Sequence, residues 1–243
     1  MKGVILAGGT GSRLYPLTKI INKHLLPIGK YPMICYPLDR LKKADIQRIL
    51  IVTNQLGAGQ MINLFGSGKN NGLEITYRVQ DQPGGIADAL GMAEDFASGE
   101  DLVVLLGDNI FQDELGDYVA AFQRQEKGAK VFLKEVAEPE GYGIAELNDK
   151  RIVGIEEKPE FPKTNLCVTG IYMYDNNVFN VIRTLQPSRR GELEISDVNR
   201  VYLEKGEISY EILKKGWMDA GTFENLSAAR GIAEAMELCL NFV

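Results

Sequence analysis

A glycine-rich stretch follows the first apolar run of the chain. In LAGGTGSRL, residues 6–14, three glycines fall within four positions. Successive glycines let backbone N–H groups converge on an anion without a Cβ in the way, and Arg13 adds a guanidinium that can hold a phosphate through two hydrogen bonds. The stretch therefore predicts an anion-binding loop at the end of a strand. The alternative is a turn that only requires positive φ.

Neither common phosphate loop matches this stretch. The dinucleotide fingerprint G-x-G-x-x-G requires a third glycine where this chain has Leu14, and no acidic residue follows about twenty positions later to hold a ribose. The pattern G-x-x-x-x-G-K-[ST] is absent from the sequence as well. A nicotinamide-dependent oxidoreductase is therefore not expected.

The positive charges at the start of the chain are not matched by negative ones. All 33 acidic residues lie after position 38, whereas the residues before it include Lys2, Arg13, Lys19, Lys23 and Lys30. The net charge of the whole chain is −6, which argues against a nucleic acid or an acidic membrane as partner. The uneven distribution indicates a local anion site; the alternative is chance clustering on a solvated face.

Histidine and thiol chemistry are not expected. His24 is the only histidine, so we interpret it as a packing or solvent-facing residue and exclude a histidine triad or metal cluster. Cys35, Cys167 and Cys239 lack metal-ligand or disulfide spacing, and we expect buried or half-buried thiols. Because cysteines this few and this far apart form no disulfide framework, a reducing, cytoplasmic location is expected, and no apolar run is long enough for a membrane span or a signal peptide.

Short apolar runs alternate with periodic segments along the chain. The expected strands are 2–7, 48–53, 74–79, 102–107, 129–136 and 169–175, with shorter ones at 142–147, 151–156 and 207–213. The expected helices are 34–44, 86–97, 115–126, 193–206 and 222–242. This pattern predicts one α/β domain over residues 1–243, with a mostly parallel, Rossmann-like mixed sheet, helices on both faces and antiparallel additions in the second half.

Motifs spread over nearly the whole chain resemble those of the sugar-1-phosphate nucleotidyltransferases. LAGGTGSRLYPLT and NKHLLP match the first signature of that family, and the match continues through GDN (107–109), YG (142–143), EEKP (156–159), VTGIYMYD (168–175), RGELEISDVN (190–199) and DAGT (219–222). The first signature is shared by members that use different nucleotides, whereas the later combination is narrower. The resemblance implies the nucleotide-diphospho-sugar transferase fold, with nucleotide binding in the N-terminal part and sugar-phosphate binding at about 130–220.

The narrower combination is most similar to family members that act on dTTP and glucose 1-phosphate. The implied reaction gives dTDP-glucose and pyrophosphate, an early step toward deoxysugars such as rhamnose. Because the attacking phosphate oxygen is already anionic, the reaction needs no general base, but it must hold two polyanions in line. The alternatives are UTP or another nucleotide and sugar, and a regulatory relative without catalysis. A homo-oligomer is expected.

The resemblance assigns the N-terminal cations to the nucleotide phosphates. Arg13 would hold the β- and γ-phosphates, and Lys23 would lie across the α-phosphate and the incoming sugar phosphate. Together with Asp108 and Lys158 they are the expected catalytic residues. Further nucleotide contacts are expected from Leu6, Gly8, Gly9, Gly11, Ser12, Gln80 and Gly85.

Two aspartates are the metal ligands that the resemblance implies. Asp108 directly follows the apolar run 102–107, and Asp219 lies in DAGT. Carboxylate and phosphate oxygens favour Mg²⁺, which is the one cofactor expected. The alternative for Asp108 is a turn or N-cap aspartate.

The sugar phosphate is expected to bind at motifs of the second half. Lys158 and Arg190 would orient the phosphate, and Glu157 would accept hydrogen bonds from sugar hydroxyls. The full expected set is Asn109, Tyr142, Gly143, Glu157, Lys158, Val168 and Arg190. The alternative for EEKP is a solvated strand end before a turn.

Gln80 follows the strand 74–79 and is expected to bind the base, together with backbone near Gly85. Its amide offers a donor and an acceptor that match thymine or uracil, but an amide rotated by 180° matches cytosine equally well. Gln80 therefore predicts a pyrimidine rather than thymine; the alternative is an edge-strand glutamine that faces water. Trp217 is expected in the core and not as a stacking platform for the base.

Longer family members continue past the DAGT helix with a segment that helps build a second, regulatory nucleotide site. Only 24 residues follow Asp219 in this sequence. The sequence therefore leaves open whether this chain has a regulatory site of that kind.

Overall fold

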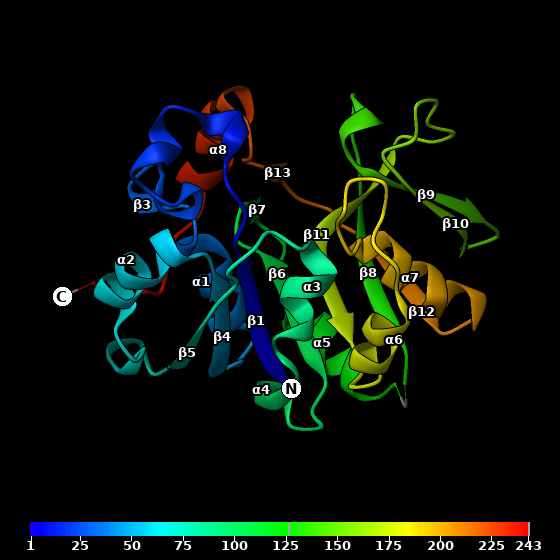
Figure 1. Cartoon of the computed structure of the whole chain (residues 1–243), viewed down its shortest axis with the longest axis horizontal. Coiled ribbons are helices and arrows are strands. Elements are labelled where there is room, and N and C mark those ends of the chain that lie inside the picture. The colour runs from blue at the N-terminus through cyan, green and yellow to red at the C-terminus, as the bar shows by residue number, and fades with distance from the viewer. Residues whose placement is uncertain (126, 243) are drawn as a thin grey trace.

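The computed structural model describes residues 1–125 and 127–242, and a mixed sheet forms its centre (Figure 1). The strands of this sheet are β1 (Lys2–Ala7), β4 (Arg48–Thr53), β5 (Glu74–Val79), β6 (Leu102–Leu106), β8 (Ala129–Glu135), β9 (Gly143–Asn148), β10 (Arg151–Glu157), β11 (Leu166–Tyr174) and β12 (Ile208–Ile212). They follow the order β10-β9-β11-β6-β1-β4-β5, and β8 pairs with both β11 and β12.

The two halves of the chain contribute differently to the sheet. Strands β5, β4, β1 and β6 are parallel, whereas β11 is antiparallel to β6, β8 and β9. Strands β9 and β10 form a hairpin whose turn residues Asp149 and Lys150 both have positive φ, as a two-residue type I′ turn requires. The prediction of a mostly parallel α/β sheet with antiparallel additions in the second half is confirmed.

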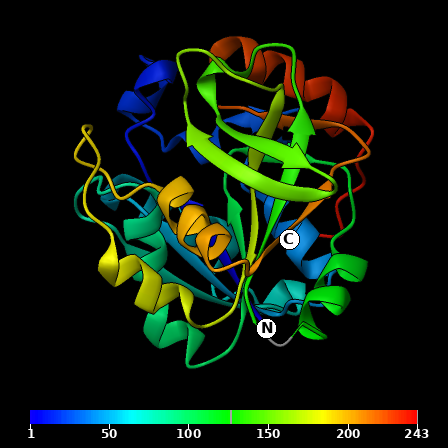
Figure 2. The ribbon, with the colours of Figure 1, turned by 90° about the vertical axis from the view of Figure 1, so that its right-hand side faces the viewer.

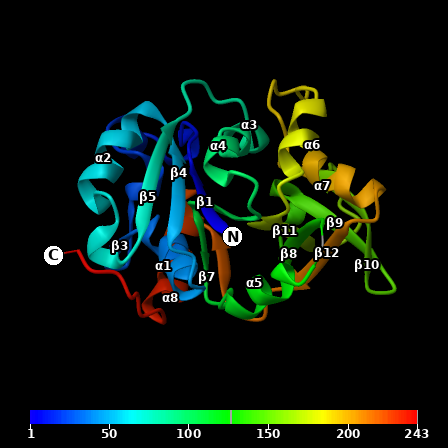
Figure 3. The ribbon, with the colours of Figure 1, turned by 90° about the horizontal axis from the view of Figure 1, so that it is seen from below.

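Helices cover both faces of the sheet. Their bounds are α1 (Cys35–Lys43), α2 (Gln55–Phe65), α3 (Ile86–Gly91), α4 (Glu94–Ala97), α5 (Gly116–Gln123), α6 (Val178–Thr184), α7 (Ile195–Glu204) and α8 (Phe223–Glu234). Figure 3 shows α1 and α5 on one side and α3, α4, α6 and α7 on the other. In β1, Ile5 and Ala7 pack into the core under α1, while Val4 and Leu6 pack under α3.

Two small sheets complete the fold. Strand β2 (Pro27–Ile28) pairs with β3 (Tyr31–Pro32), and β7 (Asn109–Phe111) pairs with β13 (Trp217–Asp219). In the view of Figure 2 the β9–β10 hairpin faces the viewer, with α7 below it. The antiparallel half therefore forms its own wall beside the parallel half.

Three of the helix predictions need correction or completion. Residues 86–97 form α3 and α4 instead of one helix, because α3 ends at Gly91, a poor helix former. The predicted helix 222–242 ends at Glu234. Helices α2 and α6 were not predicted, and residue 126, the last of the predicted helix 115–126, lies outside the described residues.

The chain after α8 is held across the surface by side chains of α1 and of the turn before β5. Asp39 Oδ1 accepts a hydrogen bond from the backbone N–H of Cys239 at 2.6 Å, and Lys42 Nζ donates to the Cys239 carbonyl at 2.6 Å. Asn71 exchanges two hydrogen bonds with the backbone of Asn241. These bonds favour an extended path over a continued helix. They also leave Cys239 exposed, so the prediction of a buried or half-buried thiol is wrong there; Cys35 and Cys167 are buried as predicted.

No helix within residues 1–125 and 127–242 is long and apolar enough to cross a membrane. The expected location and the expected homo-oligomer stay predictions.

The glycine-rich loop after β1 is fixed to α2 by a buried side chain. Asn22 Nδ2 donates to the Ala7 carbonyl at 3.1 Å and to Asn54 Oδ1 at 3.1 Å, and Thr53 Oγ1 also donates to the Ala7 carbonyl. Asn54 is the N-cap of α2 and accepts a hydrogen bond from the N–H of Gly57. Strand β1, strand β4 and helix α2 are thereby joined at the point where the loop begins.

Two glycines of α2 are expected to respond oppositely to alanine. A Cβ at Gly57 would lie 2.4 Å from Thr53 Oγ1 and 2.6 Å from Asn22 Nδ2, whereas a Cβ at Gly59 meets nothing within 4 Å. We expect Gly57→Ala to lower the free energy of unfolding by about 1–3 kcal/mol through overpacking. Gly59→Ala should raise it by roughly 0.5–1 kcal/mol through helix propensity. Urea denaturation of both variants measures the two changes, and equal effects would contradict the described packing.

Candidate active site

The carboxyl ends of four parallel strands meet at one edge of the sheet. Leu6 in β1 is in register with Val52 in β4 and with Leu106 in β6. The segments that follow these strands and β5 surround a cleft of about 490 Å³. Open α/β sheets bind their ligands at this edge because loops and helix N-termini converge there.

Most of the predicted site residues line this cleft, although they come from distant parts of the chain. The predicted residues in its lining are Leu6, Gly8, Gly9, Arg13, Lys23, Gln80, Gly85, Asp108, Asn109, Tyr142, Gly143, Glu157, Lys158, Val168 and Asp219. Gly11, Ser12 and Arg190 lie outside the lining.

The glycine loop owes its shape to Gly9 and Gly11. Both have positive φ, 81° and 64°, which a side chain would disfavour. The carbonyl of Gly11 accepts hydrogen bonds from the N–H of Leu14 at 2.9 Å and from Thr18 Oγ1 at 2.8 Å, so the chain turns at Gly11 into the 3₁₀ turn Ser12–Leu14. This turn leaves the Arg13 side chain exposed at the cleft. Gly11 and Ser12 therefore shape the loop without lining the cleft.

The pairing of β7 with β13 brings the two predicted metal ligands together. Asp219 is directly opposite Asn109, the residue after Asp108. The N–H of Ala220 donates to the Asp108 carbonyl at 2.9 Å, which fixes the second segment beside the first. Two carboxylates from distant segments consequently face the same end of the cleft.

Two cations lie against this carboxylate pair. Lys23 Nζ lies 2.5 Å from Asp108 Oδ2, and both side chains are largely buried. Burial raises the pKa of Asp108, but the charge of Lys23 and the hydrogen bonds from Lys23 and Asn109 contribute to a net pKa below its usual range. On the other side, a Cβ at Gly221 would lie 2.8 Å from Asp219 Oδ1 and 2.9 Å from an Arg13 guanidinium nitrogen, so the guanidinium lies beside the second carboxylate.

Asp219 is the carboxylate of the pair whose negative charge is less well compensated by its surroundings. Burial and the negative charge of Asp108 raise the pKa of Asp219 to about 6, although Lys23 and Arg13 oppose the shift. A divalent cation would relieve this repulsion, and two carboxylates suit a hard ion such as Mg²⁺ or Ca²⁺. No group of three or more histidine, cysteine, aspartate or glutamate side chains with metal-binding geometry occurs in residues 1–125 and 127–242. The residues present therefore fit an ion whose remaining ligands come from substrate oxygens or water.

Asn109 is a buried hydrogen-bonding partner of Asp108. It is 1% exposed, its Oδ1 accepts hydrogen bonds from the N–H of Gly170 at 2.9 Å and from Trp217 Nε1 at 2.8 Å, and its Nδ2 donates to Asp108 Oδ1 at 3.3 Å. Trp217 is buried as predicted and packs edge-on against Tyr142. The predicted contact of Asn109 with the sugar phosphate stays a prediction.

His24 is a packing residue, as predicted. It is 1% exposed, and Nδ1 lies 2.8 Å from Asn22 Oδ1. Burial and the neighbouring charge of Lys23 lower the pKa of His24 to about 3, so the imidazole is neutral near pH 7. A Cβ at Gly107 would lie 2.7 Å from the ring, which explains a glycine directly before Asp108.

A second charged cluster forms the other end of the cleft. Glu157 Oε2 accepts a hydrogen bond from Ser196 Oγ at 2.6 Å, and Glu157 Oε1 lies 3.4 Å from Lys158 Nζ and 3.5 Å from an Arg190 guanidinium nitrogen. Lys158 has a φ of 43°, an uncommon conformation for a side-chain-bearing residue, and its N–H donates to the carbonyl of Tyr142. Arg190 is also held by Glu194 at 2.8 Å. Arg190 thus stands at the rim and reaches the cleft through Glu157.

Gln80 marks the end of the cleft beyond the glycine loop. It is 9% exposed, so the alternative of a water-facing edge residue is wrong. Its Oε1 would lie 2.9 Å from a Cβ at Gly8, which places the amide directly over the loop. Asp88, which was not predicted as a site residue, accepts a hydrogen bond from Gln80 Nε2; its position three residues after Gly85, in the first turn of α3, was the available signal.

Only part of the N-terminal positive charge belongs to the cleft. Lys2 lies at the opposite end of β1 and donates to the carbonyls of Phe96 and Ala97, and Lys19 lies over the ring of Tyr15. Lys30 lines a separate hollow. Of the five cations before position 38, the cleft therefore receives Arg13 and Lys23.

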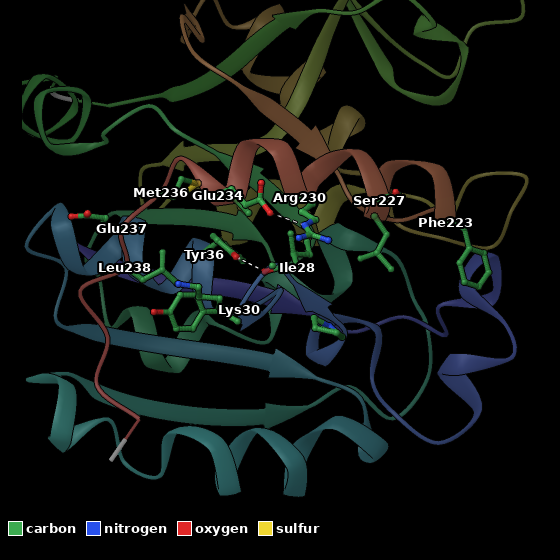
Figure 4. A pocket seen from close by; sticks show the side chains of 15 residues that line it. Ile28, Lys30, Tyr36, Phe223, Ser227, Arg230, Glu234, Met236, Glu237 and Leu238 are labelled. Atoms are coloured by element: carbon green, nitrogen blue, oxygen red, sulfur yellow. Dashed lines mark hydrogen bonds and ion pairs between the residues drawn. The ribbon is translucent and has the colours of Figure 1, made fainter.

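That separate hollow, of about 1170 Å³, lies between α8 and the β2–β3 turn (Figure 4). Its charged residues Arg230 and Glu234 form an ion pair with each other, and Tyr36 Oη donates to the carbonyl of Ile28. None of the predicted site residues is in its lining. The candidate site is therefore identified by the charged residues that line the smaller cleft, and not by the larger volume of this hollow.

Known proteins with similar sequences were found over almost the whole chain. Residues 2–235 match the family model described as nucleotidyl transferase. A glucose-1-phosphate thymidylyltransferase of Neisseria meningitidis is 44% identical over 98% of this chain and 84% of its own length. One of Mycobacterium tuberculosis is 42% identical over 98% of this chain and 83% of its own length.

Solved structures agree with the sequence comparison. A Bacillus anthracis protein assigned as a glucose-1-phosphate thymidylyltransferase superposes with a TM-score of 0.94 at 50% identity, over 98% of this chain and 97% of that one. A UDP-glucose pyrophosphorylase with bound UDP-glucose gives a TM-score of 0.85 at 26% identity, over 96% of this chain and 98% of that one. The chain belongs to the nucleotidyl transferase family and, within it, to the group of the glucose-1-phosphate thymidylyltransferases.

Proposed function

We propose that the chain transfers a thymidylyl group from dTTP to glucose 1-phosphate and releases pyrophosphate. The observation that carries the proposal is the meeting of Asp108 and Asp219 with Lys23 and Arg13 at the carboxyl edge of the parallel strands. The names of the relatives support the same pair of substrates. The product dTDP-glucose would serve deoxysugar synthesis.

The arrangement suits a reaction between two polyanions. The sugar phosphate oxygen forms a bond to the α-phosphorus while the bond from that phosphorus to the bridging oxygen of the leaving pyrophosphate breaks. The attacking oxygen carries no proton that must be removed. Burial lowers the pKa of His24 to about 3, which makes its imidazole a weak base, as suits a reaction that uses no general base.

Each cation has a distinct place along the phosphates. Arg13, exposed at the cleft on the glycine loop, would hold the β- and γ-phosphates and stabilise the leaving pyrophosphate. Lys23 would lie at the α-phosphate, where charge develops. Asp108 and Asp219 would hold Mg²⁺, which when bound neutralises phosphate charge and orients the α-phosphate.

The second charged cluster suits the acceptor substrate. Lys158 and Arg190 would orient the phosphate of glucose 1-phosphate, and Glu157, anchored by Ser196, would accept hydrogen bonds from the sugar hydroxyls. Tyr142, Gly143 and Val168 form the neighbouring wall of the cleft.

A substrate panel tests this proposal. Pyrophosphate release should be fastest, or nearly so, with dTTP and glucose 1-phosphate among five nucleoside triphosphates and several sugar 1-phosphates. Chelation by EDTA should abolish the activity, and added Mg²⁺ should restore it. The reason is that a phosphate cannot bind beside two carboxylates unless a cation offsets their repulsion. Activity with purine nucleotides alone would contradict the proposal.

The carboxylate next to Lys23 is expected to be indispensable. We expect Asp108→Asn to lower kcat by at least about 10²–10³, because an amide neither neutralises Lys23 nor binds a divalent ion as a carboxylate does. The exposed Asp117 on α5 provides the matched control, and Asp117→Asn should leave kcat unchanged. Circular dichroism and the unfolding midpoint establish that both variants are folded. A fully active Asp108→Asn enzyme would refute the metal assignment.

A further inference from the structure

The amide of Gln80 is fixed by the protein before any ligand binds. Gln80 follows β5, and its backbone N–H donates to the carbonyl of Thr53 at 2.8 Å, which ties it to the neighbouring strand β4. The residue is 9% exposed, and its side chain lies over the glycine loop, with Oε1 toward Gly8. A side chain in this position has few rotamers open to it, so its hydrogen-bonding partners determine which amide atom the cleft receives.

The protein partners of the Gln80 amide bind its nitrogen, Nε2, and leave its oxygen, Oε1, without a protein donor among the described residues. Gln80 Nε2 donates to Asp88 Oδ2 at 2.6 Å and makes a longer contact of 3.4 Å with the carbonyl of Gly85. A carboxylate has only acceptor atoms, so it can pair with the NH₂ group of the amide and not with its oxygen. Asp88 therefore forbids the amide rotated by 180°, and Oε1 remains toward the glycine loop.

Asp88 is itself held in place. It lies in the first turn of α3, where a negative charge is favoured by the helix dipole. The loop before α3 folds closely over it, since a Cβ at Gly84 would lie 2.5 Å from Asp88 Oδ2. The N–H of Leu193 donates to the carbonyl of Gly84, and the carbonyl of Leu193 accepts from the N–H of Ala87, which fixes both ends of that loop.

We propose that Asp88 is a positioning residue for base selection: by holding the nitrogen of Gln80, it presents an acceptor to the base and selects pyrimidines that carry N3–H over cytosine. Thymine and uracil donate a hydrogen bond from N3, whereas N3 of cytosine is an acceptor and would face the lone pairs of Oε1. This inference rests on the proposed function, because it assigns the base to the Gln80 end of the cleft.

A purely structural role for Asp88 gives a different expectation. The Asp88–Gln80 hydrogen bond could serve only to join β5 to α3. Its loss would then lower kcat/KM equally for all nucleotides. Orientation control instead predicts a change in the ratio between two bases. The ratio therefore separates the two roles, whatever the absolute rates.

The test uses dUTP and dCTP with glucose 1-phosphate. The two nucleotides share their sugar and lack the methyl group, so they differ only at the N3–C4 edge of the base. For the unmodified chain we expect kcat/KM for dUTP to exceed that for dCTP by on the order of 10² or more, because a wrong partner leaves buried polar atoms unpaired. In Asp88→Asn, whose amide can accept or donate, the ratio should fall by about tenfold or more. Asp88→Ala, which removes the acceptor altogether, should lower the ratio in the same direction.

Asp95→Asn is the matched control. Asp95 lies nearby on α4, pairs with Arg78, and is largely exposed. The ratio of kcat/KM for dUTP to that for dCTP in Asp95→Asn should therefore equal the ratio in the unmodified chain. An unchanged ratio in folded Asp88→Asn and Asp88→Ala, or an equal loss for both nucleotides, would overturn the inference while turnover of dTTP by the unmodified chain leaves the proposed function standing. No turnover of dTTP, dUTP or dCTP by the unmodified chain would overturn the proposed function and this inference with it.

Discussion

Repulsion between two carboxylates is the constraint around which this site is organised. Asp108 and Asp219 lie side by side because β7 pairs with β13, and burial makes their mutual repulsion costly. Lys23 balances the first carboxylate closely, while the second remains undercompensated despite Arg13. The structure thus brings two carboxylates and two cations together at the place where we propose that a metal and phosphates bind. The hydrogen bond from the buried Asn109 to Asp108 helps to keep this arrangement in place.

The sheet could be predicted from the sequence because its signals are local. Runs such as 48–53 and 102–107 are apolar on consecutive positions, and the structure has strands at both. The helices were less predictable where tertiary contacts decide. Helix α2 contains two glycines and is stabilised by the Asn54 cap and by Asn22, which lies far from it in the sequence. The segment after α8 has helical periodicity, yet hydrogen bonds to Asp39 and Lys42 hold it extended.

The candidate site divides in the same way. Motif residues such as Arg13, Asp108 and Glu157 could be identified from their sequence neighbourhood, and the structure gathers them around one cleft. The residues that orient these motif residues could not be identified from the sequence. Ser196 anchors Glu157 across 39 positions, and Trp217 contacts Asn109 across 108 positions, so only the fold reveals these pairs. The charge asymmetry pointed to the correct region but also included Lys2 and Lys30, because the sequence does not indicate which end of a strand a cation occupies.

The two hydrogen bonds between Leu193 and the start of α3 have a mechanical consequence. They join the parallel half of the chain, which carries Gln80 and the glycine loop, to the segment that carries Arg190 and Glu194. The two walls of the cleft are thus cross-linked near one rim without a covalent bond. Separation of the walls at that rim would break these two backbone hydrogen bonds, so the fold opposes widening of the cleft there.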